Sequence, residues 1–142
     1  MKIVLDTNIL WVSISRRSKT HWVIDELIKG TFTLCVTTDI LDEYEEIISR
    51  KLGSETAKSI MELLDNLPNV EYITKYFRWE LIEQDYDDNK FSDCAIACNA
   101  HYLATNDKHF NILKRIAFPK VIVINVDEFR LVIDTIIRIQ GT

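Results

Sequence analysis

Glycine and proline are scarce in this chain of 142 residues, which contains only three glycines and two prolines. So few residues of these types exclude collagen-like, low-complexity and long-linker chains. The glycines, Gly30, Gly53 and Gly141, are also too far apart to form GxGxxG or GxxxxGKS/T, the loops that cradle nucleotide phosphates. The protein must therefore bind any phosphate-bearing ligand by other means.

Long apolar runs and a cysteine framework are missing as well. The longest unbroken apolar run covers five residues, 94–98, whereas roughly 20 are needed to span a bilayer. Lys2 is followed by only three apolar residues, which is too few for the apolar core of a signal peptide. Cysteine occurs three times, an odd count without the spacing of a disulfide framework. We therefore expect a cytoplasmic protein with reduced thiols in its core and no membrane association.

Positive charge is in deficit, because 17 Lys and Arg residues oppose 22 Asp and Glu residues and give a net charge of −5. A protein that attracts nucleic acid without specific contacts is normally basic. If this protein acts on a polyanion, something must offset its carboxylates where the two meet. A bound divalent cation is the obvious candidate.

Short apolar segments alternate with stretches of helical periodicity. The pattern predicts strands at 2–6, 32–36, 70–73, 102–105 and 121–124. It predicts helices at 8–14, 21–29, 38–52, 54–64, 75–82, 93–101, 107–115 and 127–139, with Thr38 and Ser92 as N-caps of the third and sixth. Strands that alternate with helices are typical of parallel βαβ units. We therefore predict an α/β fold with one domain, residues 1–142, built on a central parallel sheet.

Acidic residues follow two of the predicted strands. Asp6 comes directly after a buried apolar run, and Asp107 follows the strand at 102–105. In parallel sheets the ligand crevice lies outside the carboxyl ends of the strands, where both carboxylates are expected. Each residue also has an ordinary structural interpretation, as a cap for the helix that follows it. Periodicity leaves both interpretations open.

Two further acidic candidates lie on predicted helices. Asp93 is in the first turn of its helix, where the helix dipole stabilises a negative charge. It shares a helical stripe with Ile96 and Ala97, so we expect its carboxylate to point along the inner face. Glu43 borders the apolar stripe of its own helix, but Glu45 borders the opposite side. Periodicity does not choose between these two glutamates.

Carboxylates that converge at strand ends repel one another and raise one another's pKa unless a cation neutralises them. Several hard oxygen ligands suit Mg²⁺ or Mn²⁺, whereas zinc prefers histidine and cysteine. Such a cation lowers the pKa of a water molecule and holds a phosphodiester in line for attack. It would also offset the acidic character of the chain.

Four segments in this order resemble the PIN-domain ribonucleases, and VapC-type toxins in particular. The segments are 5–8 (LDTN), 37–43 (TTDILDE), 88–97 (DNKFSDCAIA) and 103–107 (LATND). The resemblance covers essentially the whole chain. It implies a three-layer α/β/α fold with strand order 3-2-1-4-5. It also implies ribonuclease activity, frequent homodimers and, in operon-encoded members, an antitoxin partner.

The resemblance places the acidic quartet of the family on Asp6, Glu43, Asp93 and Asp107, and so selects Glu43 over Glu45. It implies that Asp6, Asp93 and Asp107 hold Mg²⁺ or Mn²⁺, directly or through water. Glu43 completes the pocket.

Other residues near these motifs are expected to support the site. Asn8 and Thr105 match polar positions of the family that orient ligands or water, and Asp88 is expected to add a metal or outer contact. Lys90 lies close in sequence to an acidic motif residue and is placed for a scissile phosphate. One departure from the family is the acidic segment 80–89, which is longer and more negative than a minimal toxin requires.

Cysteine and histidine offer weaker signals. Cys94, Cys98 and His101 are spaced on one helix as i, i+4 and i+7, which resembles a metal site. Three ligands on one helix seldom complete a tetrahedron, and the neighbouring residues are apolar, so core packing is favoured. For His21 and His109 we expect solvent-facing or capping positions.

The sequence thus predicts a Mg²⁺- or Mn²⁺-dependent endoribonuclease, the toxin of a toxin–antitoxin pair. Its partners are an RNA substrate, an antitoxin protein and a second copy in a homodimer. Hydrolysis should leave 5′-phosphate and 3′-hydroxyl ends. The alternative is a catalytically silent PIN-like module that binds RNA or protein, although a silent site would have no need for four mutually repelling acids.

Overall fold

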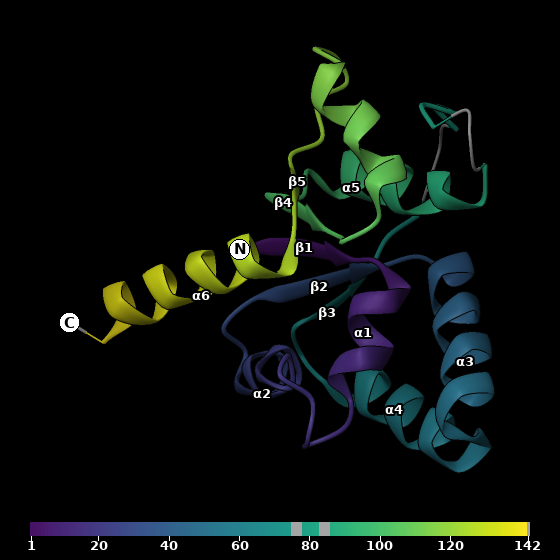
Figure 1. The fold of residues 1–142 in the computed structure, drawn as a ribbon, viewed down its shortest axis with the longest axis vertical. Helices are drawn as coiled ribbons and strands as arrows, with labels where there is room; N and C mark the ends of the chain where they lie inside the picture. Colours follow the sequence, from purple (N-terminus) through teal and green to yellow (C-terminus); the bar gives the residue numbers. More distant parts are fainter. Residues whose placement is uncertain (75–77, 83–85, 142) are drawn as a thin grey trace.

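A five-stranded sheet forms the centre of the computed structural model, which describes residues 1–74, 78–82 and 86–141 (Figure 1). The strands are β1 (Lys2–Leu5), β2 (Thr33–Val36), β3 (Val70–Tyr72), β4 (Tyr102–Ala104) and β5 (Val123–Ile124). Their order is β3-β2-β1-β4-β5, and each neighbouring pair is parallel. The predicted class and strand order are therefore confirmed.

Helices cover both faces of this sheet, as predicted. The α-helices are α1 (Thr7–Ser13), α2 (Trp22–Lys29), α3 (Thr38–Leu52), α4 (Ser54–Asn66), α5 (Asn89–Cys98) and α6 (Val126–Gln140). The 3-10 helices are η1 (Tyr86–Asp88) and η2 (Lys108–Arg115). In Figure 1, α5 lies on one side of the sheet, and α1, α3 and α4 lie on the other. α6 packs beside α2, where the Phe129 and Trp22 ring centres are 5.4 Å apart.

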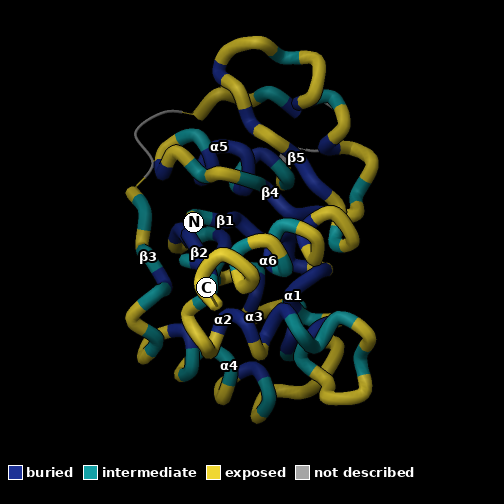
Figure 2. Tube along the Cα trace, turned by 90° about the vertical axis from the view of Figure 1, so that its left-hand side faces the viewer, coloured by how far each residue is buried: buried dark blue, intermediate teal, exposed yellow. Residues whose placement is uncertain are grey.

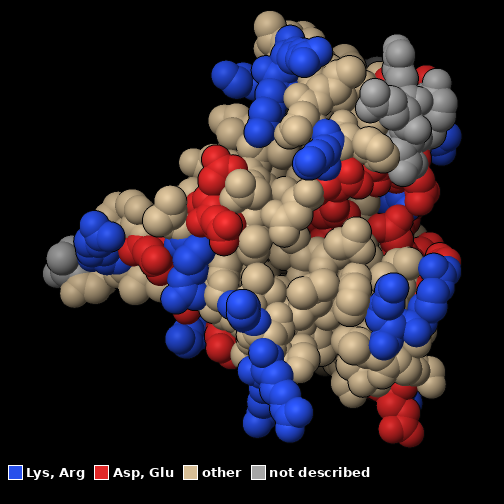
Figure 3. Space-filling view, viewed as in Figure 1, with Lys and Arg blue, Asp and Glu red and all other residues tan. Residues whose placement is uncertain are grey.

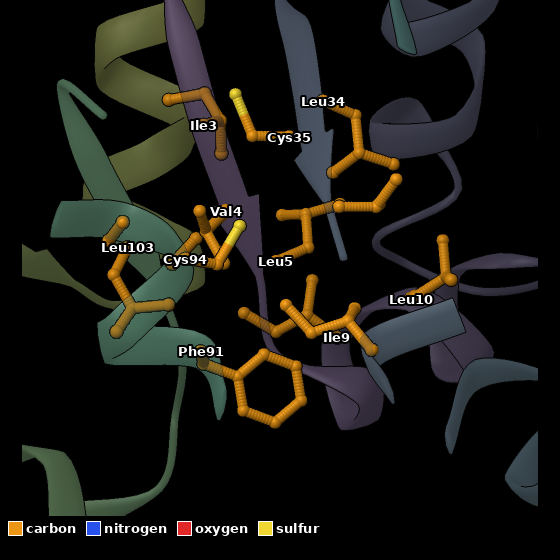
Figure 4. Close-up of a cluster of buried hydrophobic side chains, with 14 of the residues drawn as sticks. Ile3, Val4, Leu5, Ile9, Leu10, Leu34, Cys35, Phe91, Cys94 and Leu103 are labelled. Atoms are coloured by element: carbon orange, nitrogen blue, oxygen red, sulfur yellow. The ribbon is translucent and has the colours of Figure 1, made fainter. Parts of the chain in front are cut away.

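The core is centred on β1. Ile3, Val4 and Leu5 are fully buried, because helices cover both faces of the strand. Figure 4 shows Phe91 and Cys94 of α5 close to these side chains. The trace in Figure 2 is buried along β1 and much of α5 and exposed on the outer turns. Tight packing of β1 therefore fixes the position of the residue that follows it, Asp6.

Both predicted N-caps are wrong. Thr37, not Thr38, caps α3, since its Oγ1 accepts a hydrogen bond from the Ile40 backbone N–H at 3.4 Å. α5 begins at Asn89, so Ser92 lies inside the helix and donates its hydroxyl hydrogen to the Asn89 carbonyl oxygen at 3.1 Å. A serine hydroxyl can accept at an N-cap or donate to a carbonyl one turn back, and the local sequence does not distinguish the two.

The helix predicted at 75–82 does not form at residues 78–82, and residues 75–77 lie outside the described residues. The side chain of Asn89 holds the end of this segment instead. Its Oδ1 accepts a hydrogen bond from the Ile82 N–H at 2.9 Å, and its Nδ2 donates to the Ile82 carbonyl oxygen at 3.1 Å. Since Ile82 is fully buried, these bonds fix the 78–82 segment against the start of α5.

The helix predicted at 93–101 is α5, which begins four residues earlier and ends three residues earlier, and the helix predicted at 107–115 is the 3-10 helix η2. The remaining predicted elements are present, with ends shifted by at most two residues. All three cysteines are free and buried, as expected. His101 is exposed, and its Nδ1 accepts a hydrogen bond from the Lys2 backbone N–H at 3.0 Å, so it does not join the cysteines in a metal site. In the described part of the chain, no helix has both the length and the apolar character needed to cross a membrane.

Candidate functional site

Asp6 follows β1 at the carboxyl edge of the sheet, with only 5% of its surface exposed. Its backbone N–H donates to the Ala104 carbonyl oxygen at 3.0 Å, which continues the strand ladder and holds the residue in place. Its side chain makes no capping hydrogen bond to α1. Instead, Oδ2 accepts a hydrogen bond from the Thr105 hydroxyl at 2.7 Å. The capping alternative for the Asp6 side chain is therefore not realised.

The carboxylate of Asp6 is poised between its protonated and ionised forms. The pKa of Asp6 is raised from 3.8 to about 6: burial raises it most, the hydrogen bond from Thr105 lowers it, and the charges of Asp107 and Glu43 add to the rise. Those two carboxylates therefore lie near enough to repel the charge of Asp6. Three of the four predicted acids share one electrostatic environment.

Thr105 connects the two strand-end acids. Its hydroxyl donates to Asp6, and its Oγ1 accepts a hydrogen bond from the Asp107 backbone N–H at 3.0 Å. Asp107 in turn caps η2, since its Oδ1 accepts a hydrogen bond from the His109 backbone N–H at 2.9 Å. For Asp107 both interpretations left open by the sequence hold: it caps a helix and its charge acts on Asp6.

Glu43 reaches the site from α3, and Glu45 does not. One oxygen of Glu43 accepts a hydrogen bond from the Thr7 hydroxyl, and the other accepts one from Lys90 Nζ at 2.9 Å. Glu45 lines a separate cavity together with residues of α4. The packing of α1 against α3 therefore brings Glu43, and not Glu45, to the site, which periodicity alone did not predict.

Lys90 is a mostly buried cation on α5, with 13% of its side chain exposed. Its Nζ lies 2.9 Å from Glu43 Oε1 and 3.0 Å from Asp87 Oδ1. Burial lowers the pKa of Lys90, but the hydrogen bonds to Glu43 and Asp87 outweigh it, so the pKa is raised overall. Lys90 therefore carries its positive charge at neutral pH.

The helical stripe that Asp93 shares with Ile96 and Ala97 predicts that it is buried on the inner face of its helix, but the structure buries it in another way. Ala97, on that stripe, is exposed, and the inward face of α5 carries Phe91, Cys94 and Cys98. Asp93 is nevertheless only 4% exposed, and one of its carboxylate oxygens accepts a hydrogen bond from the Trp79 backbone N–H at 3.1 Å. The non-helical 78–82 segment therefore covers this carboxylate.

A cavity of about 360 Å³ opens beside Lys90 and Asp93. The residues that line it are Asp39, Arg78, Glu80, Asp87, Asn89, Lys90 and Asp93. Asn8 and Asp107 both line a second cavity, of about 280 Å³. The Oδ1 of Asn8 accepts a hydrogen bond from the Trp11 ring N–H at 3.1 Å. Figure 3 shows acidic side chains gathered between the positions of α5 and α3 in Figure 1.

His109 is exposed, as the sequence predicts, but it also lies beside two acids in a grouping that the sequence interpretation did not anticipate. Its Nδ1 lies 3.6 Å from Asp107 Oδ1 and 3.9 Å from Asp88 Oδ2. Within the described residues, this is the one group of three potential metal ligands whose donor atoms all lie within 4.8 Å of one another. The predicted set of Asp6, Asp93 and Asp107 is not brought to that spacing. The one sequence signal for this grouping is the spacing of Asp107 and His109, two positions apart at the start of a helix.

Comparison with known proteins agrees with this architecture. A family model described as "PIN domain" matches residues 2–109. The VapBC2 complex of Rickettsia felis, solved with a DNA fragment from its promoter, contains a chain that is 24% identical, with a TM-score of 0.62 over 88% of this chain and 98% of that one. A chain of VapBC-1 from nontypeable Haemophilus influenzae is 20% identical, with a TM-score of 0.59 over 89% and 99%.

VapC20 of Mycobacterium tuberculosis, described as a toxin that cleaves the sarcin–ricin loop, is 16% identical, with a TM-score of 0.53 over 77% of this chain and 92% of that one. No curated protein matches the sequence. At these identities the solved structures show a shared fold, whereas the family model spans most of the chain and includes Asp6, Glu43, Asp93 and Asp107. The chain therefore belongs to the PIN domain family.

Proposed function

We propose that this protein is a divalent-cation-dependent endoribonuclease and the toxin of a toxin–antitoxin pair. The observation that carries the proposal is the environment of Asp6, a buried carboxylate whose pKa is raised to about 6 beside Asp107 and Glu43. Buried acids that repel one another destabilise a fold, so their assembly at a strand edge favours a role in binding a cation. Membership of the PIN domain family supports the same activity.

The residues present fit a hard or borderline divalent cation. Asp6 and Asp107 follow β1 and β4 at the carboxyl edge of the sheet, Asp93 lies on α5, and we propose these three carboxylates as ligands, directly or through water. Asp88 and His109 lie around Asp107 and add a carboxylate and an imidazole. Oxygen donors suit Mg²⁺ and Mn²⁺, and the imidazole is a better donor to Mn²⁺ than to Mg²⁺.

The chain's own groups organise the reaction. Thr105 holds Asp6 and Asp107 together, and burial keeps water away from Asp6. A bound divalent cation supplies Lewis acidity at the phosphodiester and lowers the pKa of the attacking water. Above about pH 6 Asp6 is ionised and ready to receive the cation. Attack in line with the 3′-oxygen leaving group yields 5′-phosphate and 3′-hydroxyl ends.

Digestion of an RNA mixture with analysis of the product ends tests this proposal. We expect cleavage with Mn²⁺ or Mg²⁺, no cleavage in EDTA, and loss of cleavage in Asp6→Asn. Glu45→Gln is the matched control, because Glu45 lies at a separate cavity, and it should cleave as the wild type does. Products with 2′,3′-cyclic phosphate, or cleavage that survives EDTA, would contradict the proposal.

The proposed partners are an antitoxin and a second copy of the chain. The Rickettsia felis and Haemophilus influenzae structures are VapBC complexes, and their VapBC chains share the fold described above. Light scattering of the purified protein tests the homodimer. Co-purification with the product of a short reading frame directly upstream tests the antitoxin.

One observation favours the alternative of a catalytically silent RNA- or protein-binding module. Asp6, Asp93 and Asp107 do not lie at ligand spacing in the described residues, whereas Asp88, Asp107 and His109 do. Calorimetric titration with Mn²⁺ separates the two functions. Binding at or below millimolar Mn²⁺ supports the nuclease, and its absence supports the silent module.

A further inference from the structure

Lys90 is held as a fixed cation at the edge of the acidic site. Its ammonium group lies between a carboxylate of α3, Glu43 at 2.9 Å, and a carboxylate of η1, Asp87 at 3.0 Å. The side chain of Glu43 is also mostly buried, at 18% exposure. A lysine with so little exposure has given up most of its rotamer freedom, so its charge has a defined position.

Both carboxylate oxygens of Glu43 have partners within the protein. One accepts from Lys90 and the other from the Thr7 hydroxyl, and Thr7 is itself buried at the start of α1. The charge of Glu43 is thus offset by a neighbouring ammonium group. A divalent cation that bound to Glu43 would come within repulsive range of Lys90.

We propose, on the basis of the proposed nuclease function, that Glu43 is a positioning residue for Lys90 rather than a cation ligand, and that Lys90 binds a phosphate of the RNA substrate. An ammonium group has three N–H donors. Glu43 and Asp87 accept two of them, and one remains for a substrate oxygen.

The cavity beside Lys90 is consistent with this substrate group. It has a volume of about 360 Å³, and Lys90 and Arg78 are the two cations among its lining residues. The other charged residues that line it are acidic, so an anion can be held there only near these two groups. Backbone phosphate is the anion that an RNA substrate presents.

Calorimetry with Mn²⁺ and a double-mutant cycle test the role of Glu43. If Glu43 acts through Lys90, Glu43→Gln leaves the Kd for Mn²⁺ within about twofold of wild type, and Lys90→Met tightens Mn²⁺ binding by removing a repelling charge. The loss of kcat caused by Glu43→Gln is then absent in a Lys90→Met background. A tenfold or greater weakening of Mn²⁺ binding by Glu43→Gln, or additive losses of kcat, would overturn the assignment.

Fluorescence anisotropy with a labelled RNA oligonucleotide in EDTA tests Lys90 without catalysis. We expect Lys90→Met to weaken binding about tenfold and to reduce the slope of log affinity against log salt by about 0.7, with partial rescue in Lys90→Arg. Unchanged affinity and slope would overturn the phosphate contact.

Glu46→Gln and Arg50→Met are matched controls, because Glu46 and Arg50 form an exposed ion pair on α3 at 2.8 Å. Both should behave as wild type, and thermal melting verifies that every variant is folded. A wild type that binds Mn²⁺ and RNA without cleaving it overturns the nuclease function, while the binding measurements still decide the roles of Glu43 and Lys90. A wild type that binds neither overturns both.

Discussion

At the residue scale, burial of Asp6 disfavours its ionised form, although Asp6 lies at the carboxyl edge of the sheet, where we propose that its negative charge binds a cation. The β1 ladder holds its backbone, and Thr105 donates to its carboxylate. The hydrogen bond from Thr105 lowers the pKa of Asp6 by less than burial raises it, so this pKa remains near 6. In the absence of a cation, the ionised form of Asp6 therefore lowers the free energy of unfolding at neutral pH.

We expect Asp6→Asn to stabilise the cation-free protein at pH 7 but not at pH 4. The pKa of Asp6 rises from 3.8 to about 6 on folding, so the stability associated with its protonated form is present below about pH 4 and is lost as pH rises through 6. The difference of about two pKa units corresponds to a loss of up to about 3 kcal/mol in the free energy of unfolding. Asparagine keeps the acceptor for Thr105 and has no charge to bury.

Urea unfolding in EDTA at pH 4 and pH 7 measures this effect. Asp42→Asn is the control, because Asp42 is exposed on α3 and should change little at either pH. An Asp6→Asn variant that is less stable than wild type at pH 7 would show that the carboxylate is structural.

At the element scale, short side-chain bridges hold the strand ends and the covering segment together. Thr105 links β1 to the start of η2, and Asn89 links α5 to the 78–82 segment. Each bridge satisfies backbone or carboxylate groups that regular secondary structure leaves without partners. Thr105 contacts an acid of the proposed site directly, and Asn89 holds the segment whose Trp79 N–H contacts Asp93.

Thr105→Val should destabilise the protein by about 1–3 kcal/mol, because it removes the donor to Asp6 and the acceptor for the Asp107 N–H while it keeps the side-chain shape. It should also raise the pKa of Asp6, since the hydrogen bond from Thr105 lowers it. Chemical denaturation and carboxyl NMR titration measure the two effects. Thr135→Val, at an exposed position of α6, is the control and should cost far less. Equal costs at the two positions would refute a bridging role.

Asn89→Ala should release the 78–82 segment from α5. The buried N–H and carbonyl of Ile82 would lose their partners, at a cost of about 1–3 kcal/mol. Hydrogen exchange should accelerate at the Ile82 and Trp79 amides, because the Trp79 N–H contacts Asp93 within the same segment. Asn66→Ala, which removes an exposed bond to the Glu62 carbonyl oxygen, is the control. Unchanged protection at Trp79 would mean that Asn89 does not hold the cover over Asp93.

At the scale of the whole molecule, the proposed function requires an acidic protein to approach a polyanion. The net charge is −5, and acidic groups line the cavity beside Lys90. A divalent cation reduces repulsion both among the site carboxylates and between protein and RNA. Cation binding should therefore appear in the global stability as well as in activity.

We expect Mn²⁺ at about 100 times its Kd to stabilise the wild type by about 2.7 kcal/mol, which raises Tm by roughly 5–10 °C. Asp93→Asn should be as stable as wild type or more so in EDTA, since asparagine can still accept from the Trp79 N–H and adds no charge. It should gain much less from Mn²⁺ and lose cleavage. Thermal melting of both proteins in EDTA and in Mn²⁺ checks this. An equal gain from Mn²⁺ would remove Asp93 from the cation site.

Local patterns account for the framework and for part of the site. Apolar segments as short as β1 and β4 can be buried on both faces only within a covered parallel sheet, so their alternation with helices predicts the class. Asp6 and Asp107 follow from the same pattern, because a residue directly after a buried strand lies at the sheet edge whatever else the chain does.

What the sequence by itself determined is therefore the α/β framework and the two acids at its strand ends, because both depend on neighbours within a few residues. Only the tertiary structure decided between Glu43 and Glu45, covered Asp93 with the 78–82 segment, and placed Lys90 against Glu43. These outcomes depend on how α3 and α5 pack across the sheet. Contacts between residues 14 and 47 positions apart arise from that packing, and no local periodicity encodes them.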